Sequence, residues 1–305
     1  MSVPSPRVRK VVIPAAGRGT RLLPATKSQP KEMLPVARKP TIQYVVEEMV
    51  GAGLSHILIV SGRSKRAIDD HFDPDTSLQA ELSRKQNAEL LEQLAFERLD
   101  VHYFYARQSE PRGLGHAVLL AEEFVAGEPF VVALGDSIIW HGENHSLMTR
   151  LIETHLQACA AATIAVEEVP AADVVHYGIV EPKHEVGPVF PIADLIEKPS
   201  VEAAPSRYAI AARYVFNPQI FEMLRRTEPG HGGEIQLTDA IRQLLRAGWP
   251  VWCVRLEKDQ QRYDIGNFES YFRAFVEISL RDPELGEGLR AHLRRLLAVG
   301  EENGS

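Results

Sequence analysis

The amino-acid sequence predicts an α/β protein whose parallel sheet is covered by helices on both faces. Short apolar segments rich in β-branched residues alternate with helical segments through the first half of the chain, as βαβ units require. The chain has 305 residues, of which 45% are hydrophobic, and is therefore long enough to bury a large core. The second half is less regular. We interpret it as a β-rich part inserted into, or appended to, one α/β domain.

The first half contains four short apolar segments typical of buried parallel strands. They are Val8–Pro14, His56–Val60, Val101–Ala106 and Phe130–Leu134. Apolar residues at helical spacing, or a composition rich in Glu, Leu, Gln and Lys, predict the helices between them. These helices are Ile42–Val50, Ala67–Phe72, Leu78–Leu99 and Leu114–Phe124.

The second half mixes shorter strands with helices. The predicted strands are Thr163–Glu168, Gly178–Glu181, Ile192–Glu197, Tyr208–Phe216 and Val251–Leu256. The predicted helices are Leu147–Cys159, Pro218–Arg225, Ile235–Ala247 and two at the C-terminus, at about 267–281 and 283–298. Leucines at helical spacing in the last helix indicate packing against the core or, alternatively, a subunit contact.

Charge and composition argue against several classes of protein. Lys+Arg 34 against Asp+Glu 41 gives a net charge of −7, whereas proteins that bind nucleic acid or anionic membranes are basic. The two cysteines, Cys159 and Cys253, form no CxxC pair, so neither a zinc ribbon nor a disulfide framework is expected. Residues 1–10 lack the apolar core of a signal peptide, and no apolar run approaches the ~20 residues that span a bilayer. We expect a soluble, cytoplasmic protein with neither a nucleic-acid nor a membrane partner.

A glycine turn follows the first predicted strand, at the carboxyl edge where open parallel sheets bind ligands. Residues 15–22 read Ala-Ala-Gly-Arg-Gly-Thr-Arg-Leu, and Gly17 and Gly19 allow backbone N–H groups to approach an anion. The turn is not a GxGxxG fingerprint, because Gly19 is followed by Thr-Arg-Leu. It is not a Walker loop either, because Thr26 and not glycine precedes Lys27.

Basic residues gather around this turn. Residues 7–39 hold nine lysines and arginines against one acid, Glu32, a local balance of +8 in a chain of net charge −7. Cations beside a glycine turn suit a polyphosphate, which needs N–H donors and Lys or Arg together. A solvated basic surface is the alternative interpretation.

Two aspartates are candidate metal ligands. Asp136 follows the strand Phe130–Leu134, at the sheet edge that also carries the glycine turn, and Asp264 lies in the segment YDIGN at 263–267. If the fold brings them together, two carboxylates and the oxygens of a phosphate would suit Mg²⁺. Their separation in the sequence does not show this, and a turn or a helix N-cap is the alternative role of each.

Lys198 ends another predicted strand, where Pro199 stops the extended run. A solvated lysine before a turn is the alternative. The histidines are scattered singly, and neither an HExxH pattern nor a GxSxG elbow occurs, so we predict no zinc centre and no covalent nucleophile.

Six segments together resemble the sugar-phosphate nucleotidylyltransferases, and most of all their branch of bacterial-type UTP–glucose-1-phosphate uridylyltransferases. The segments are 15–27 (AAGRGTRLLPATK), 30–35 (PKEMLP), 113–117 (GLGHA), 197–199 (EKP), 234–239 (EIQLTD) and 263–267 (YDIGN). They occur in that family's order and cover about Val8 to Phe275. The first is shared by the wider superfamily, whereas PATK with PKEMLP, and EIQLTD, are typical of the uridylyl branch.

The resemblance implies a Rossmann-like fold with a mixed, mostly parallel sheet flanked by helices, a small β-rich part and C-terminal helices. The implied catalytic domain covers residues 1–282, with a nucleotide half at about 8–140 and a sugar-phosphate half at about 141–266. A C-terminal helix and tail follow at 283–305. The family also implies a homo-oligomer, either a dimer or a tetramer.

The implied reaction joins UTP to α-D-glucose 1-phosphate, with Mg²⁺ as cofactor, and gives UDP-glucose and pyrophosphate. The attacking phosphate oxygen is already ionised at neutral pH, which agrees with the lack of a catalytic His or Ser pattern. The site residues are carried over by motif. For the nucleotide, the resemblance implies contacts from Ala16, Gly17, Gly19 and Thr20, pyrimidine contacts from Gln108 and Gly113, and triphosphate ligands Arg21 and Lys31. For the metal and the sugar, it implies Mg²⁺ ligands Asp136 and Asp264, sugar contacts Gly178 and Glu197, and the sugar-phosphate ligand Lys198. Arg21, Lys31, Asp136 and Lys198 form the implied catalytic set.

Four positions depart from the family's pattern without removing a catalytic group. Arg18 replaces a small or apolar residue, Arg112 a lysine, Gly135 a proline and Gly233 an often acidic residue. They leave the identity of the sugar open. The alternatives are the same chemistry with dTTP or another hexose 1-phosphate, and a non-catalytic sugar-nucleotide sensor, against which the presence of both aspartates and Lys198 argues.

Overall fold

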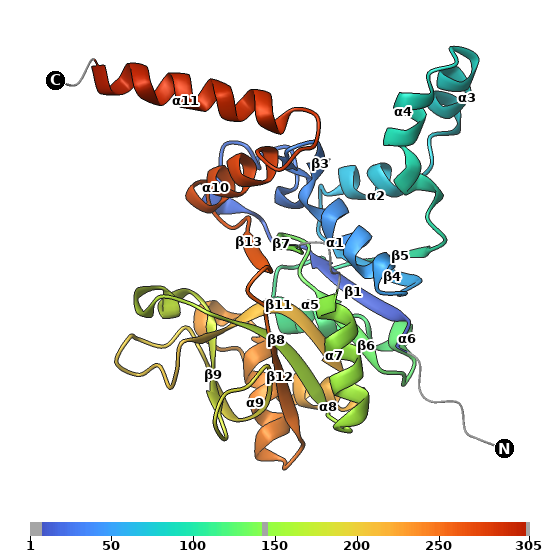
Figure 1. Cartoon of the computed structure of the whole chain (residues 1–305). Helices are drawn as coiled ribbons and strands as arrows, with labels where there is room; N and C mark the ends of the chain where they lie inside the picture. Colours follow the sequence, from blue (N-terminus) through green and yellow to red (C-terminus); the bar gives the residue numbers. More distant parts are fainter. Residues whose placement is uncertain (1–7, 142–145, 303–305) are drawn as a thin grey trace.

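A nine-stranded sheet forms the centre of the structure, a computed structural model that describes residues 8–141 and 146–302 (Figure 1). In spatial order its strands are β5 (His102–Arg107), β4 (His56–Ser61), β1 (Lys10–Ala15), β6 (Phe130–Ala133), β11 (Tyr208–Phe216), β8 (Ala162–Glu168), β12 (Val251–Arg255), β10 (Val189–Glu197) and β9 (Gly178–Pro182). Strands from both halves of the chain therefore share one sheet.

The first-half strands are parallel, as predicted. β1 pairs with β4 from Lys10 opposite His56 to Ala15 opposite Ser61, and β1–β6 and β4–β5 run in the same sense. In the second half β8 and β12 are parallel, but β11 is antiparallel to β6 and β8, and β10 to β9 and β12. The mixed α/β class is confirmed, whereas the expectation of a mostly parallel sheet is not. β9 and β10 are joined by a short loop, which allows only antiparallel pairing.

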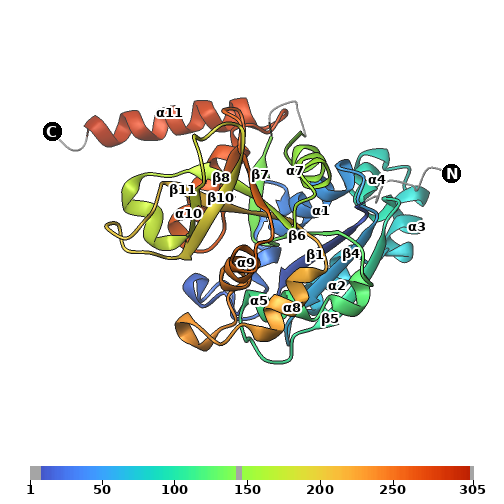
Figure 2. The same ribbon diagram turned by 90° about the horizontal axis from the view of Figure 1, so that it is seen from below.

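Helices cover both faces because side chains alternate along the buried strands. Val11 and Ile13 pack with α1 (Thr41–Gly51), α2 (Arg66–Phe72) and α7 (Ser146–Gln157). On the opposite face, Val12 belongs to the core formed with the remaining covering helices, which Figure 2 shows grouped on one side. These are α5 (Leu114–Leu119), α6 (Glu122–Val125), α8 (Gln219–Arg226) and α9 (Leu237–Arg246).

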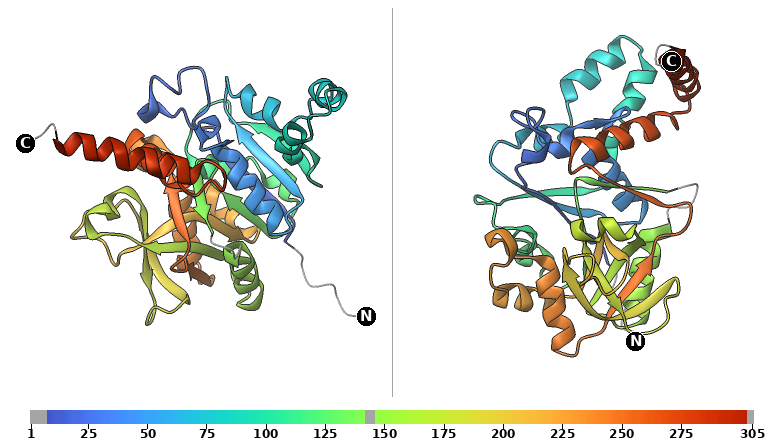
Figure 3. Two further views of the ribbon diagram at one scale, coloured as in Figure 1. Left: turned by 45° about the horizontal axis from the view of Figure 1, so that its top comes forward. Right: turned by 90° about the vertical axis from the view of Figure 1, so that its left-hand side faces the viewer.

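A two-stranded antiparallel ribbon adjoins the sheet. It pairs β7 (Ser137–Trp140) with β13 (Gln261–Asp264), and Asp264 lies opposite Ser137. The ribbon packs on α10 (Phe268–Ser279) through Ile138 and Tyr263. The last helix, α11 (Gly286–Glu302), extends away from the body of the molecule (Figure 3). Among the described helices, none is long and apolar enough to cross a membrane.

Two of the predicted helices are broken. The expected helix Leu78–Leu99 is wrong: the segment forms α3 (Thr76–Arg84), α4 (Ala88–Gln93) and the 3₁₀ turn η3 (Ala95–Arg98). Gln86 has φ 53°, which no helix accommodates, and the Asn87 side chain accepts a hydrogen bond from the Leu90 N–H and so starts a new helix. The expected helix Leu114–Phe124 divides into α5 and α6.

The other predicted elements are confirmed within a few residues, although β10 begins at Val189 rather than Ile192. The four residues of β7 were not predicted. The remaining short elements are β2 (Pro35–Val36), β3 (Lys39–Pro40) and the 3₁₀ turns η1 (Thr20–Leu22), η2 (Lys31–Met33), η4 (Ala171–His176) and η5 (His231–Gly233).

Candidate active site

Three adjoining cavities lie at the carboxyl ends of the parallel strands. The largest, about 550 Å³, is lined by polar residues from both halves of the chain: Arg21, Lys31, Asp136, Tyr177, Glu197, Lys198, Gln236, Thr238, Arg262 and Asp264. A second, of about 220 Å³, shares Lys31 and Asp136 with the first and is also lined by Gly17, Gln108 and Gly113. A third, of about 290 Å³, shares Gln108 with the second. The three cavities are therefore connected in a row: the first and second share Lys31 and Asp136, and the second and third share Gln108.

The glycine turn wraps closely over Lys31. Gly19 has φ 65°, and a Cβ there would lie 3.3 Å from the Cβ of Lys31. A Cβ at Gly17 would lie 3.8 Å from the Lys31 Nζ. The Thr26 hydroxyl donates to the Gly19 carbonyl at 2.8 Å and closes the turn. Ala16 and Gly17 line the smaller cavities, whereas Gly19 and Thr20 shape the turn and line none of the three cavities in the part of the chain described.

Two ion pairs join η2 to the loops that follow β6 and β4. Lys31 donates to the carboxylate of Asp136, and Lys65 donates to that of Glu32 at 2.8 Å. Burial disfavours the charge of Lys31, but Asp136 and Glu32 outweigh it and raise the pKa of the ammonium above its ordinary value. Lys31 therefore stays cationic where the first two cavities meet.

The two aspartates lie together, as the sequence could not show. The Ile265 N–H donates to the Asp136 carbonyl at 2.9 Å, and Asp264 sits opposite Ser137 in the β7–β13 ribbon. Burial and the charge of Asp136 raise the pKa of Asp264. Burial acts in the same direction on Asp136, but Lys31 outweighs it and lowers the pKa of that carboxyl. A cation placed between the two carboxylates would relieve the repulsion that Asp264 experiences.

The largest cavity is also lined by Glu197, the last residue of β10, and by Lys198, which follows it. The Thr238 hydroxyl donates to Glu197 Oε2 at 2.9 Å, and the Lys198 Nζ lies 3.5 Å from Glu197 Oε1. The Lys198 side chain remains 43% exposed. Gly178 faces the same space, where a Cβ would lie only 2.8 Å from the Thr238 methyl. Any side chain at position 178 would therefore collide with the neighbour that holds Glu197.

The second cavity brings two sequence segments together. Gly113 has φ 97°, and a Cβ there would lie 2.7 Å from the Ile235 carbonyl, so only glycine fits. The Gly115 N–H donates to the same Ile235 carbonyl at 2.8 Å, and the Ile235 N–H donates to the Arg112 carbonyl at 2.9 Å. The GLGHA and EIQLTD segments are thus docked on one another. Gln108 lies beside them and is 5% exposed.

Sequence reasoning missed several lining residues. Arg262 pairs with Glu167 in the interior, and its guanidinium lies 4.3 Å from the ring centre of Tyr177. It stands two positions before Asp264 on β13, so alternation along the strand would have placed both on one face. Arg63 and Lys65 line the third cavity with Arg18 and Lys27. Their position after β4, at the carboxyl edge of the sheet, was the available signal.

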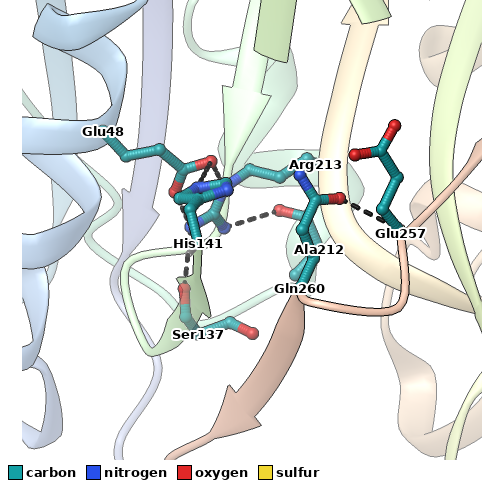
Figure 4. Close-up of polar contacts among 7 residues, drawn as sticks. All are labelled: Glu48, Ser137, His141, Ala212, Arg213, Glu257 and Gln260. Carbon is teal, nitrogen blue, oxygen red and sulfur yellow. Dashed lines mark hydrogen bonds and ion pairs between the residues drawn. The ribbon is translucent and has the colours of Figure 1, made fainter. Parts of the chain in front are cut away.

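A buried ion pair supports the turn that carries Asp136 (Figure 4). Arg213 on β11 is 0% exposed, and its Nη2 donates to Glu48 Oε2 on α1 at 2.6 Å and to the Ser137 carbonyl at 2.9 Å. Its Nη1 donates to the Ala212 carbonyl at 3.1 Å. The His141 Nε2 lies 3.6 Å from Glu48 Oε1. The pair joins the helix layer, the sheet centre and the first residue of β7.

These side chains together can bind strongly anionic ligands. The cavities carry cations from both halves of the chain, exposed backbone at the glycine turn, and two adjacent carboxylates that could hold a divalent cation. Among the described residues no cluster of three or more His, Cys, Asp or Glu could hold a metal ion. A metal at the two aspartates would therefore need further ligands from a bound molecule.

Comparison with known proteins places the chain among enzymes that use such ligands. The family model described as nucleotidyl transferase matches residues 10–280. The protein named UTP–glucose-1-phosphate uridylyltransferase of Bacillus subtilis (strain 168) is 45% identical over 293 residues, which make up 95% of this chain and 98% of that protein. UTP-bound UGPase from Acinetobacter baumannii superposes with a TM-score of 0.87 at 36% identity, covering 95% of this chain and 100% of that one. A UDP-glucose pyrophosphorylase complexed with UDP-glucose superposes with a TM-score of 0.81 at 36% identity, covering 90% and 100%.

Proposed function

Because the chain belongs to the nucleotidyl transferase family, we propose that it transfers the uridylyl group of UTP to α-D-glucose 1-phosphate. An oxygen of the sugar phosphate attacks the α-phosphorus, the bond from this phosphorus to the oxygen that bridges to the β-phosphate breaks, and pyrophosphate leaves. The products are UDP-glucose and pyrophosphate. The observation that carries the proposal is the largest cavity, whose lining brings Lys198 together with Arg21, Lys31 and the two aspartates.

The nucleotide belongs at the glycine turn. Ala16 and Gly17 offer backbone to the nucleoside in the second cavity, beside Gln108 and Gly113. The α-phosphate would sit where the first two cavities meet, because Lys31 lines both. Lys31 and Arg21 then neutralise the charge that builds on the leaving oxygen as the bond breaks.

The sugar phosphate belongs in the largest cavity, at Glu197 and Lys198. The half-exposed side chain of Lys198 can bind its phosphate, because its ammonium makes a long ion pair of 3.5 Å with Glu197 and has donors left for a second anion. The Glu197 carboxylate, fixed by Thr238, can accept hydrogen bonds from sugar hydroxyls. The close fit at Gly178 leaves backbone rather than a side chain against the sugar. The two anions would thus share one cavity whose cations offset their repulsion, which allows the sugar phosphate to approach the α-phosphorus.

Mg²⁺ fits the pair Asp136 and Asp264. Two adjacent carboxylates, with the remaining ligands supplied by phosphates and water, match its preference for sites shared with a polyphosphate. When bound, the ion would offset the negative charge on the phosphates. The chain itself holds the Asp136 backbone through the Ile265 N–H and keeps Lys31 protonated beside it. No general base is needed, because the attacking phosphate is ionised at neutral pH.

We extend the proposal to the organisation of the chain. The nucleotide half is about residues 8–140 and the sugar-phosphate half about 141–266; in support, the second cavity is lined almost entirely by the first half, whereas the largest draws on both. Exposed apolar side chains on α10, α11 and the loop between them, among them Phe272, Leu285 and Leu297, support a homo-oligomer. The two free cysteines are consistent with the reducing environment of the cytoplasm.

A substrate matrix tests the proposed function. Pyrophosphate release is measured with UTP, CTP, ATP, GTP and dTTP against several hexose 1-phosphates, with and without Mg²⁺. We expect the highest rate with UTP, glucose 1-phosphate and Mg²⁺ together. A higher rate with dTTP or another sugar would change the substrate. Binding of UDP-glucose with no release from any pair would instead indicate a sugar-nucleotide sensor.

A further inference from the structure

The side-chain amide of Gln108 is held in one orientation by two acceptors. Its Nε2 donates to the Gly113 carbonyl at 3.1 Å and lies 2.8 Å from the Nδ1 of His116, on α5. The Gln108 backbone is fixed as well, because its N–H donates to the Ser61 carbonyl at 2.8 Å. Gln108 itself lines both the second and the third cavity. The orientation of the Gln108 amide at the proposed nucleotide site is therefore fixed before a ligand binds.

The chemistry of the two partners determines which end of the amide faces the cavity. An amide nitrogen carries two N–H donors, and both are used by Gly113 and His116. A flipped amide would bring its oxygen against the Gly113 carbonyl and the His116 nitrogen, where oxygen could accept nothing from the carbonyl. The amide oxygen therefore faces away from both partners, and it accepts no hydrogen bond among the described residues.

His116 can accept this bond only while its Nδ1 carries no proton. Burial and the nearby Arg112 lower the pKa of His116, which keeps the ring neutral at physiological pH. The neutral ring then carries its hydrogen on Nε2 and leaves Nδ1 as an acceptor. Of the two acceptors that hold the Gln108 amide, the Gly113 carbonyl belongs to the backbone and His116 is a side chain. Only the His116 contact can therefore be removed by substitution.

We propose that His116 is a positioning residue for base selection: by holding the Gln108 amide nitrogen it aims the amide oxygen at the base, and so favours a pyrimidine that carries an N3–H. Uracil and thymine have this donor, whereas cytosine has an unprotonated N3 that would face the oxygen as a second acceptor. The inference rests on the proposed function. The contact separates UTP from CTP, and His116 contributes nothing to any preference between UTP and dTTP, because both bases carry the N3–H.

The test compares nucleotide preference in the full-length protein. His116→Phe keeps a ring and removes the acceptor, and kcat/KM for UTP, dTTP and CTP is measured at saturating glucose 1-phosphate. Loss of one hydrogen bond should lower the UTP-to-CTP ratio by about fivefold to tenfold, while the UTP-to-dTTP ratio stays unchanged. His116→Asn places an amide oxygen near the position of Nδ1 and should restore most of the UTP-to-CTP ratio.

A matched control is available on the other side of the sheet. His71 also contacts a glutamine amide, with its Nε2 3.1 Å from Gln43 Oε1, but it lines none of the three cavities in the described part of the chain. His71→Phe should leave the UTP-to-CTP ratio unchanged. Both ratios are internal to one preparation, so a reduced folded fraction does not alter them, and His116→Leu replaces the phenylalanine variant if that protein does not fold.

The outcomes separate the two proposals. A wild-type protein that prefers UTP, together with a His116→Phe variant whose UTP-to-CTP ratio is unchanged, overturns the role of His116 alone. Equal loss of the ratio in His116→Phe and His116→Asn does so as well, because the acceptor would then be irrelevant. A wild-type protein that turns over no nucleotide with any sugar phosphate refutes the proposed function itself.

Discussion

The Glu48–Arg213 pair gives a stability prediction that can be worked from its geometry. Arg213 is 0% exposed and the Glu48 side chain 6%, and three nitrogen-to-oxygen contacts join them at 3.1, 3.1 and 2.6 Å. Arg213→Met leaves the Glu48 carboxylate buried without its arginine, with only the His141 ring beside it at 3.6 Å. Removing one partner of a buried pair costs about 3–5 kcal/mol of unfolding free energy. We expect the same loss from Glu48→Leu.

The double variant should be more stable than either single variant. Replacing both charges with apolar side chains of similar size is often neutral, but the Ser137 carbonyl would also lose the donor that Arg213 supplies at 2.9 Å. A buried carbonyl without a donor costs about 1–3 kcal/mol. We therefore expect the double variant to lose about 1–3 kcal/mol, which is less than either single replacement loses.

Urea denaturation of the four proteins at neutral pH measures these free energies, and the pH dependence adds a second readout. Burial raises the pKa of Glu48, but Arg213 and His141 together outweigh it and lower the pKa below its ordinary value of 4.5, so the charged carboxylate stabilises the fold above that pH. This stabilisation should be lost as the pH falls through the lowered pKa, and the double variant should lack that loss. A double variant as unstable as the sum of both single variants would refute the reasoning, because the two side chains would then act independently.

Three further predictions concern the site. Lys198→Ala should lower kcat by about a hundredfold to a thousandfold and leave the Kd of UTP nearly unchanged in calorimetry, because its ammonium acts on the sugar phosphate alone; a weakened UTP affinity would reassign it. Asp264→Asn should raise the concentration of Mn²⁺ needed for half-saturation, followed by electron paramagnetic resonance with UTP bound, by at least about tenfold, since one of two carboxylate ligands is lost; unchanged Mn²⁺ binding would remove Asp264 from the metal site. Arg21→Ala should weaken UTP binding by about tenfold to a hundredfold and glucose 1-phosphate binding much less, in separate titrations; equal weakening would contradict its assignment to the triphosphate.

The carboxyl-edge location of the site was predictable from the sequence because local patterns encode it. Short runs of β-branched residues such as His56–Val60 are typical of buried parallel strands. The residues that follow such strands meet at the carboxyl edge of the sheet. The glycine turn and Asp136 were found on this ground. The role assigned to each site residue remains a prediction, whereas it is observed that all of them except Gly19 and Thr20 line the three connected cavities.

The rest depends on long-range pairing, which no local pattern carries. Asp264 reaches Asp136 because β13 pairs with β7, a four-residue strand too short to recognise. The charge of Arg213 interrupts an otherwise apolar strand, and only the distant Glu48 explains it. In contrast, the break in the predicted helix Leu78–Leu99 had a local signal, because Asn87 is a good N-cap inside the helical run.

A crystal structure with UDP-glucose and Mn²⁺ tests the central claim most directly, because anomalous scattering locates the ion independently of the ligand. We predict the ion between Asp136 and Asp264, the uracil beside Gln108, and the glucose against Glu197 and Thr238, with the phosphates between Lys31 and Lys198. Density for the ligand outside these cavities, or an ion bound away from both aspartates, would contradict the account.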